Sequence, residues 1–181
     1  MEDKALLSTE EASGAEKAEL LIVIPAYNEA ENIERVVNHL TANFPQYDYV
    51  VVNDGSRDET AAICQRNGYN LLNLPVNLGL AGAFQAGLKY ADKYGYQYAV
   101  QLDGDGQHRP EYLESMIKKM EEGYDIVIGS RFVGEKKPFT MRMLGSNLIE
   151  MAIRFTTGVN IKDPTSGMRM FSKRMIREFA S

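Results

Sequence analysis

Cysteine and long apolar segments are scarce in this chain of 181 residues. Cys64 is the only cysteine, so no disulfide can form within the chain, and a reducing compartment fits this composition. No apolar run reaches the roughly eighteen residues that suggest a membrane-spanning helix. The N-terminus also lacks the apolar core of a signal peptide. These absences lead us to expect a cytoplasmic protein in which Cys64 is a small packing residue.

Basic residues are outnumbered by acidic ones. The formal net charge is −5 and the pI about 5.2, which argues against bulk nucleic-acid binding. Residues 1–19 hold six acidic and two basic residues, and we expect this segment to be disordered. With an overall hydrophobic content of 44%, residues 20–181 suffice for one soluble domain with its own core.

Common ligand-binding loops are missing. The turn after the first predicted strand lacks the G-x-G-x-x-G of dinucleotide-binding folds, because residues 25–29 read Pro-Ala-Tyr-Asn-Glu. The absence of any G-K-S/T sequence excludes a P-loop. An EF-hand starting at Asp103 is also excluded, because His108 occupies the position of its invariant glycine and a strand precedes the loop.

Strand and helix patterns alternate along the chain. Apolar runs predict strands at residues 21–24, 49–52, 71–75, 98–102 and 125–129. Between them lie helix patterns, whose predicted start signals are Asn28 as an N-cap, a capping box at 56–59, and Pro110 in a first turn. The alternation predicts an α/β fold with a mostly parallel sheet and helices on both faces.

Two aspartates one residue apart follow the fourth predicted strand. In an extended segment Asp103 and Asp105 would lie on the same side of the backbone, where two close carboxylates repel each other. A divalent cation removes this conflict, and Mg²⁺ or Mn²⁺ suits carboxylate oxygens while keeping positions open for phosphates. Gly104 would let a ligand approach the backbone closely. An acidic turn without a ligand is the alternative.

Polar residues also follow the other predicted strands. They are Tyr27, Asn28, Glu29, Asp54, Ser130 and Arg131. Ligands of open α/β sheets bind beyond the carboxyl ends of the strands, at a switch in strand order. We therefore expect these residues and the two aspartates to converge on a metal–diphosphate site.

The ordered set of motifs resembles family 2 glycosyltransferases of the GT-A fold, which is Rossmann-like. Within that family it is most similar to the dolichyl- and polyprenyl-phosphate sugar transferases. The likeness runs from about Leu20 to the C-terminus. The segments that carry it are IPAYNE (24–29), VNDGS (52–56), NLG (77–79) with Gly82, QLDGD (101–105), GSR (129–131) and DPTSGMR (163–169).

The resemblance implies a role for each matching residue. The nucleotide pocket would be formed by Pro25, Tyr27, Glu29, Asp54, Asn77, Gly79, Gly82, Asp103 and Gly104. Asp103, Asp105 and Gln107 would hold Mg²⁺ or Mn²⁺ against the diphosphate. Arg131 and Arg169 are candidates for phosphate contacts, because a guanidinium fork matches phosphate geometry. Solvated surface arginines are the alternative for both.

The implied reaction is metal-assisted, inverting transfer of a sugar from a UDP- or GDP-sugar to a polyprenyl phosphate or glycan acceptor. No obvious late acidic pair could serve as general base, which favours the phosphate acceptor, already an anion. The apolar segment 139–155 with its two arginines is expected either to meet the cytoplasmic face of a membrane or to pack on another surface. Relatives usually continue beyond the position of Ser181, so a truncated acceptor half and a homo-oligomer covering its apolar face are further expectations.

Two other functions remain open at this stage. A nucleotide-sugar-binding remnant would bind the donor without turnover. A phosphatase of the haloacid-dehalogenase type would use the Leu-Asp-Gly-Asp-Gly sequence as its nucleophile loop. In that family, however, the motif normally follows the first strand of the core, and here it follows the fourth.

Overall fold

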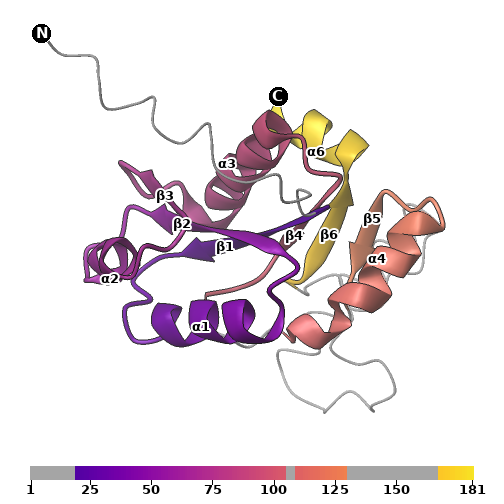
Figure 1. Cartoon of the computed structure of the whole chain (residues 1–181). Helices are drawn as coiled ribbons and strands as arrows, with labels where there is room; N and C mark the ends of the chain where they lie inside the picture. Colours follow the sequence, from indigo (N-terminus) through magenta and orange to yellow (C-terminus); the bar gives the residue numbers. More distant parts are fainter. Residues whose placement is uncertain (1–18, 105–108, 130–166) are drawn as a thin grey trace, which may run out of the picture.

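The computed structural model describes residues 19–104, 109–129 and 167–181 (Figure 1). Several expectations fall outside these ranges. They concern the N-terminal segment before Glu19, Asp105, Gln107, Arg131 and the apolar segment 139–155.

Strands and helices follow one another in the predicted order. The strands are β1 (Leu20–Ala26), β2 (Asp48–Asp54), β3 (Leu71–Leu74), β4 (Tyr98–Gln101), β5 (Ile126–Ile128) and β6 (Arg169–Ser172). The helices are α1 (Ile33–Asn43), α2 (Thr60–Arg66), α3 (Gly79–Tyr94), the short 3-10 helix η1 (Pro110–Tyr112), α4 (Leu113–Glu121) and α6 (Lys173–Ala180). The five predicted strands are confirmed, whereas β6 was not predicted.

The strands form one sheet in the order β3-β2-β1-β4-β6-β5. β1 pairs in parallel with β2 and β4, and β2 pairs in parallel with β3. β6 runs antiparallel to both β4 and β5. The mostly parallel sheet is thus confirmed, with β6 as its antiparallel member. The strand order reverses at β1, which creates a switch point beside the carboxyl ends of β1 and β4.

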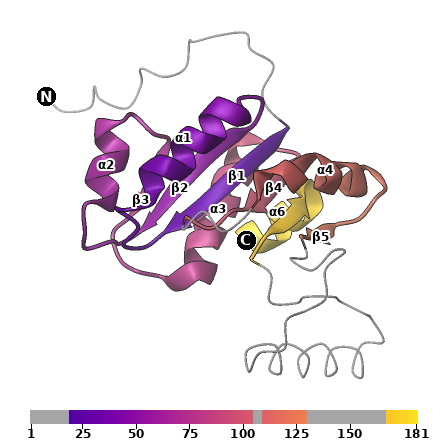
Figure 2. The ribbon, with the colours of Figure 1, turned by 90° about the horizontal axis from the view of Figure 1, so that it is seen from below.

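Helices cover both faces of the sheet (Figures 1 and 2). Leu20, Ile22 and Ile24 of β1 contribute to the core under α1, α2 and α4. Leu21 and Val23 contribute to the opposite core, under α3 and α6. Because β1 is buried on both faces, its sequence is a continuous apolar run and not an alternating one. The predicted architecture is confirmed.

Two predicted helix starts are wrong. Asn28 is not the N-cap of α1, because it lies in the preceding turn with a φ of 57°. Ser56 does not open a capping box, because α2 begins only at Thr60. The physical reason is that these polar groups bond to each other across two turns, as in the 3.0 Å hydrogen bond from the Asn28 N–H to the Ser56 Oγ.

Two other local predictions are confirmed. Pro110 begins η1, which leads directly into α4, so the proline does occupy a first helical turn. Cys64 is fully buried in the core against α1 and α2, where burial raises the pKa of its thiol. Within the three described ranges, no helix combines the length and the apolar character needed to cross a membrane.

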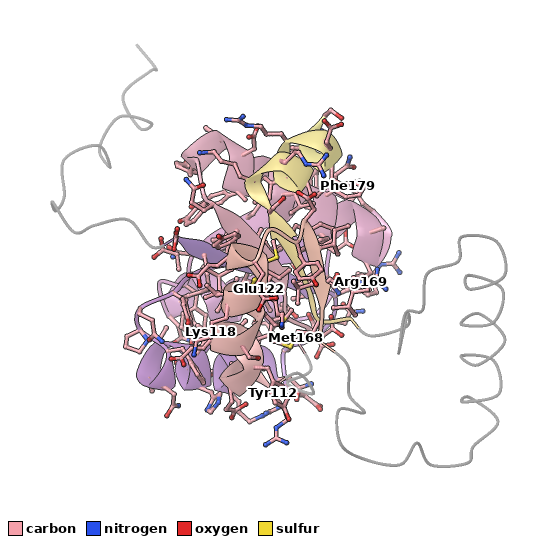
Figure 3. All side chains as sticks on the ribbon, turned by 90° about the vertical axis from the view of Figure 1, so that its right-hand side faces the viewer. Tyr112, Lys118, Glu122, Met168, Arg169 and Phe179 are labelled. Atoms are coloured by element: carbon pink, nitrogen blue, oxygen red, sulfur yellow. The ribbon has the colours of Figure 1, made fainter. Side chains whose placement is uncertain are left out.

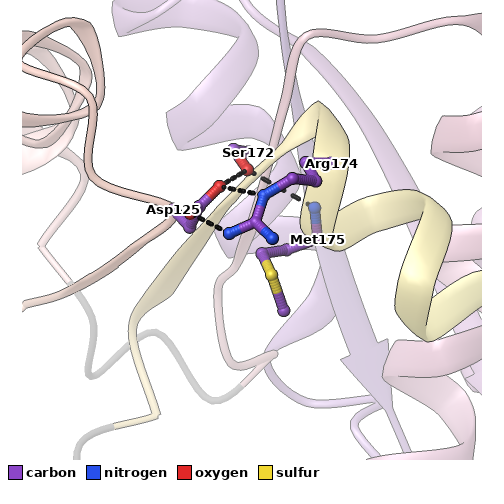
Figure 4. A network of polar contacts seen from close by, with 4 residues as sticks. All are labelled: Asp125, Ser172, Arg174 and Met175. Atoms are coloured by element: carbon purple, nitrogen blue, oxygen red, sulfur yellow. Dashed lines mark hydrogen bonds and ion pairs between the residues drawn. The ribbon is translucent and has the colours of Figure 1, made fainter.

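A polar cluster fixes α6 to the edge of the sheet (Figure 4). Asp125, immediately before β5, accepts hydrogen bonds from Ser172 Oγ at 2.8 Å and from Arg174 Nε at 3.1 Å. Ser172 Oγ in turn accepts from the Met175 N–H and caps α6. The bonds from Arg174 and Ser172 hold the pKa of Asp125 below its ordinary value. The cluster thereby ties together the two antiparallel strands that end the sheet.

Candidate functional site

A pocket of about 440 Å³ lies at the carboxyl ends of β1, β2 and β4. Its lining residues are Pro25, Ala26, Tyr27, Glu29, Asp54, Asn77, Gly79, Leu80, Ala83, Asp103 and Gly104. These residues come from four separate segments of the chain, and the parallel strands bring them to the same edge of the sheet. Eight of the nine residues predicted to bind the nucleotide therefore lie around one pocket; the ninth, Gly82, does not.

The turn after β1 forms one wall of the pocket. Tyr27 lines the pocket and is 44% exposed, so its side chain is accessible to a ligand that could stack on the ring. Glu29 accepts a hydrogen bond from Asn32 Nδ2 at 2.9 Å, which fixes its carboxylate at the rim. The backbone carbonyl of Glu29 also accepts from the Ile33 N–H, so this wall continues into α1. An aromatic face and a fixed carboxylate suit a planar base and a ribose.

Asp54 lies at the back of the pocket and is only 3% exposed. Its Oδ1 accepts a 2.7 Å hydrogen bond from the Leu78 N–H, which draws the loop after β3 to the end of β2. Gly55 permits this approach, because a Cβ there would lie 2.7 Å from the Asn77 nitrogen. A buried carboxylate with one oxygen already bonded presents the other as a directional acceptor.

Asp103 closes the pocket on the β4 side. Gln101, a buried residue at the end of β4, donates a hydrogen bond from Nε2 to Asp103 Oδ1 at 2.9 Å. This contact restrains the rotation of the carboxylate. Gly104 lies so near the β1 turn that a Cβ would be 3.2 Å from the Pro25 carbonyl oxygen. Sequence reasoning identified Asp103 and missed Gln101, although its place two residues before Asp103 on one strand face was a usable signal.

Asp103 is the one predicted cation ligand among the described residues. Asp103 presents carboxylate oxygen to the pocket, the ligand type that Mg²⁺ and Mn²⁺ prefer. The other two predicted ligands, Asp105 and Gln107, lie outside the described residues. Among the residues that are described, no group of three or more acidic, histidine or cysteine side chains could hold a metal by itself.

Gly82 and Arg169 belong to a neighbouring groove of about 550 Å³. Gly82 faces Leu78, whose Cβ would be 2.5 Å from a Cβ at position 82, so this glycine allows close packing within the first turns of α3. Arg169 begins β6 and lies on the same side of the molecule as Phe179 of α6 (Figure 3). Most of the other lining side chains are apolar, among them Leu80, Phe84, Leu88 and Phe171, while Gln85 and Gln101 add two amides.

The two cavities are adjacent. Leu80 lines both of them, and Gln101, which lines the groove, is bonded to Asp103 of the pocket. Arg169, the predicted phosphate contact, therefore lies in the groove beside the Asp103 side of the pocket and not within the pocket itself. Arg131, the other candidate, is outside the described residues.

The strand order, the antiparallel β6 and the acidic pocket at the switch point define a protein of the GT-A class. The comparison with family models identifies the family: residues 21–179 match the model of glycosyl transferase family 2. The chain belongs to this family.

Two curated relatives have names that refer to polyprenol or dolichyl-phosphate sugar derivatives. The chain is 32% identical to polyprenol monophosphomannose synthase of Mycolicibacterium smegmatis, an alignment that covers 87% of this chain and 63% of the relative. It is also 32% identical to UDP-N-acetylglucosamine–dolichyl-phosphate N-acetylglucosaminyltransferase of Methanococcus voltae, over 87% of this chain and 71% of the relative. The chain thus spans about two thirds of the length of these curated relatives.

Solved structures share the fold. Glucosyl-3-phosphoglycerate synthase from Mycobacterium tuberculosis, in complex with Mn²⁺ and UDP-glucose, superposes with a TM-score of 0.68. The match covers 87% of this chain and 57% of that protein, at 20% sequence identity. At this identity the likeness concerns the fold alone.

Proposed function

We propose that this protein transfers a sugar, with inversion, from a nucleotide-sugar to a polyprenyl phosphate, with the help of Mg²⁺ or Mn²⁺. The observation that carries the proposal is the pocket at the switch point. It combines a partly exposed aromatic side chain at Tyr27, a buried carboxylate at Asp54 and an oriented carboxylate at Asp103. These are the groups needed for a base, its polar edge and a cation-bound diphosphate.

The nucleoside would occupy the β1–β2 side of the pocket. Tyr27 would stack on the base, and Glu29 would accept from a ribose hydroxyl. Asp54 would accept from a base N–H through Oδ2, because Oδ1 is already bonded to the Leu78 N–H. A charged acceptor at the end of such a hydrogen bond discriminates strongly against a base without the matching donor.

The diphosphate would lie near Asp103, which with Asp105 and Gln107 would hold the cation. When bound, the cation supplies charge neutralisation on the leaving nucleoside diphosphate. The role of Gln101 is to hold Asp103 in position, through its hydrogen bond to Asp103 Oδ1. Gly104 keeps the backbone close to the β1 turn, which brings the two sides of the donor site together.

The adjoining groove favours a lipid phosphate over a glycan as the acceptor. The side chains that line the groove are largely apolar. Among the described residues that line it, Arg169 is the cationic one. An isoprenoid chain would bury apolar surface there, while its phosphate would lie near Arg169 and Asp103. Polyprenol monophosphomannose and dolichyl phosphate appear in the names of two relatives. Contact of residues 139–155 with the cytoplasmic face of a membrane, and self-association, are parts of the same proposal.

Isothermal titration of UDP and GDP, each with and without Mn²⁺, tests the donor site. We expect Mn²⁺-dependent binding of one nucleotide, which Asp103→Ala should abolish. Asp92→Ala on the far part of α3 is the matched control and should bind as the parent does. Failure of both nucleotides to bind would refute the donor site, and binding by Asp103→Ala that still responds to Mn²⁺ would refute the role of this carboxylate.

Transfer of labelled sugar to a short-chain polyprenyl phosphate tests the acceptor. Arg169→Gln should raise the KM for the lipid phosphate and leave nucleotide affinity unchanged. Donor binding without transfer would instead indicate a nucleotide-sugar-binding remnant. Release of phosphate from simple phosphate esters, without any nucleotide, would indicate a phosphatase.

A further inference from the structure

Four hydrogen bonds join the turn after β1 to the turn after β2. In each of them the two partners are separated by 28 to 31 positions in the sequence. In three of them, consecutive N–H groups of the β1 turn donate to side chains of the β2 turn. The Asn28 N–H donates to Ser56 Oγ at 3.0 Å, the Glu29 N–H to Thr60 Oγ1 at 2.9 Å, and the Ala30 N–H to an oxygen of Asp58 at 3.1 Å.

The fourth bond runs in the other direction. The Arg57 N–H donates to Asn28 Oδ1 at 2.9 Å. This contact uses the side chain of the residue whose φ of 57° turns the chain away from β1. Asparagine tolerates that left-handed conformation better than most residues. The backbone and the side chain of Asn28 are therefore both bonded to the β2 turn.

Asp58 and Thr60 form the centre of this network. Thr60 is fully buried, and its hydroxyl donates to Asp58 Oδ1 at 2.5 Å while accepting from the Glu29 N–H. The Thr60 N–H donates to the same Asp58 oxygen at 3.0 Å. Desolvation alone would raise the pKa of Asp58, but hydrogen bonds from Thr60 and Ala30 outweigh it and lower that pKa. Asp58 is thus an ionised acceptor whose two oxygens are both engaged within the protein.

The N–H groups of the β1 turn find no acceptor in a side-chain cap of α1. These groups precede α1, which starts at Ile33 without a side-chain cap at its N-cap residue. Unbonded donors at such a position cost free energy or bind water, and a water-bonded turn would be free to move. The β2 turn supplies the missing acceptors. It thereby fixes the turn that carries Tyr27 and Glu29, two of the residues that line the pocket.

We propose that Asp58 and Thr60 are positioning residues for the donor nucleotide, acting as a clamp that holds the Tyr27–Glu29 wall opposite Asp54. This inference rests on the proposed function of the pocket. Neither Asp58 nor Thr60 lines the pocket, so they act through the turn and not by contact with the ligand. The clamp joins the turns of β1 and β2, just as the Asp54 bond to the Leu78 N–H joins those of β2 and β3.

The test compares two substitutions at one position. Thr60→Val keeps the size and branching of the side chain but removes the hydroxyl, so the Glu29 N–H loses its acceptor. Thr60→Ser keeps the hydroxyl and should restore the contact. Thr41→Val is the matched control, because the Thr41 hydroxyl bonds only to carbonyls of its own helix, α1. UDP and GDP are titrated into each variant with Mn²⁺ by calorimetry.

A positioning role predicts a change in affinity and not in the number of binding sites. Thr60→Val should weaken binding of the preferred nucleotide about tenfold, with a stoichiometry unchanged from the parent. Thr60→Ser and Thr41→Val should bind within about threefold of the parent, which is less than a typical hydrogen-bond contribution. A purely structural role would instead lower the stoichiometry, through loss of folded protein, and leave the Kd of the remaining sites unchanged.

Asp58→Asn keeps the proposal testable if Thr60→Val does not fold. Asp58 is exposed, so its substitution removes no core packing, while the neutral amide can no longer accept with both terminal atoms. We expect weaker nucleotide binding and faster hydrogen exchange at the amides of Glu29 and Ala30. Unchanged Kd in both variants, with a parent that binds, would overturn the clamp alone. A parent that binds neither nucleotide would overturn the proposed donor site and the clamp with it.

Discussion

Gly55→Ala should damage both stability and nucleotide binding, because Gly55 meets two separate constraints. Its φ is 63°, a left-handed conformation that a non-glycine residue adopts at a cost of about 1–2 kcal/mol. A Cβ there would also lie 2.7 Å from the Asn77 nitrogen and 2.7 Å from the Val76 carbonyl carbon. These are backbone atoms that cannot rotate away, so the loop after β3 must shift, at a further cost of about 1–3 kcal/mol.

Gly68→Ala separates the two contributions. Gly68 has a similar φ of 66°, but nothing lies within 4 Å of its Cβ position. Urea unfolding should therefore show a loss of about 1–2 kcal/mol for Gly68→Ala and about 2–5 kcal/mol for Gly55→Ala. Only Gly55→Ala should weaken nucleotide binding, because the displaced loop carries the Leu78 N–H that bonds to Asp54. Equal losses of stability with equal nucleotide affinity would refute this reasoning.

Two further predictions concern polar contacts. Gln101→Leu removes the donor to Asp103 Oδ1 and should weaken Mn²⁺-dependent nucleotide binding about tenfold. Gln85→Leu, which removes only the bond from Nε2 to the Phe179 carbonyl, should not weaken it. Equal affinities of the two variants in titration calorimetry would contradict the positioning role of Gln101. Burial and the hydrogen bond to Asp48 raise the pKa of Tyr96 well above its ordinary value. Stability from this contact is therefore complete below the unfolded-state pKa of about 10 and is lost as pH rises further. Thermal unfolding between pH 8 and about 11 should show a steeper loss for the parent than for Tyr96→Phe; parallel curves would mean that Tyr96 is not perturbed.

The fold was largely predictable because it depends on periodic apolar patterns. A continuous apolar run such as that of β1 is typical of a strand buried on both faces of an α/β sheet, and the helical patterns between the strands supply the two covering layers. β6 escaped prediction because Arg169–Ser172 holds only two apolar residues between polar ones and lacks the apolar run that marks the other strands.

The residues of the pocket were predictable for a topological reason. Parallel strands end at the same edge of a sheet, so polar residues after several strands must gather there, as Tyr27, Asp54 and Asp103 do. Gly82 lies outside the pocket because one turn of α3 rotates it towards Leu78. A motif gives the order of residues along the chain, but the helix decides which of them faces the ligand.

The sequence by itself determined the α/β architecture, the buried strands and the identity of the acidic residues at their ends, because these depend on local pattern and on general rules of topology. Only the tertiary structure decided how the turns are held. Asn28 and Ser56 each matched a helix-start signal, yet each bonds to the other turn. Local capping and long-range pairing compete for the same donors and acceptors, and the pairing prevails once the adjacent parallel strands place the two turns side by side.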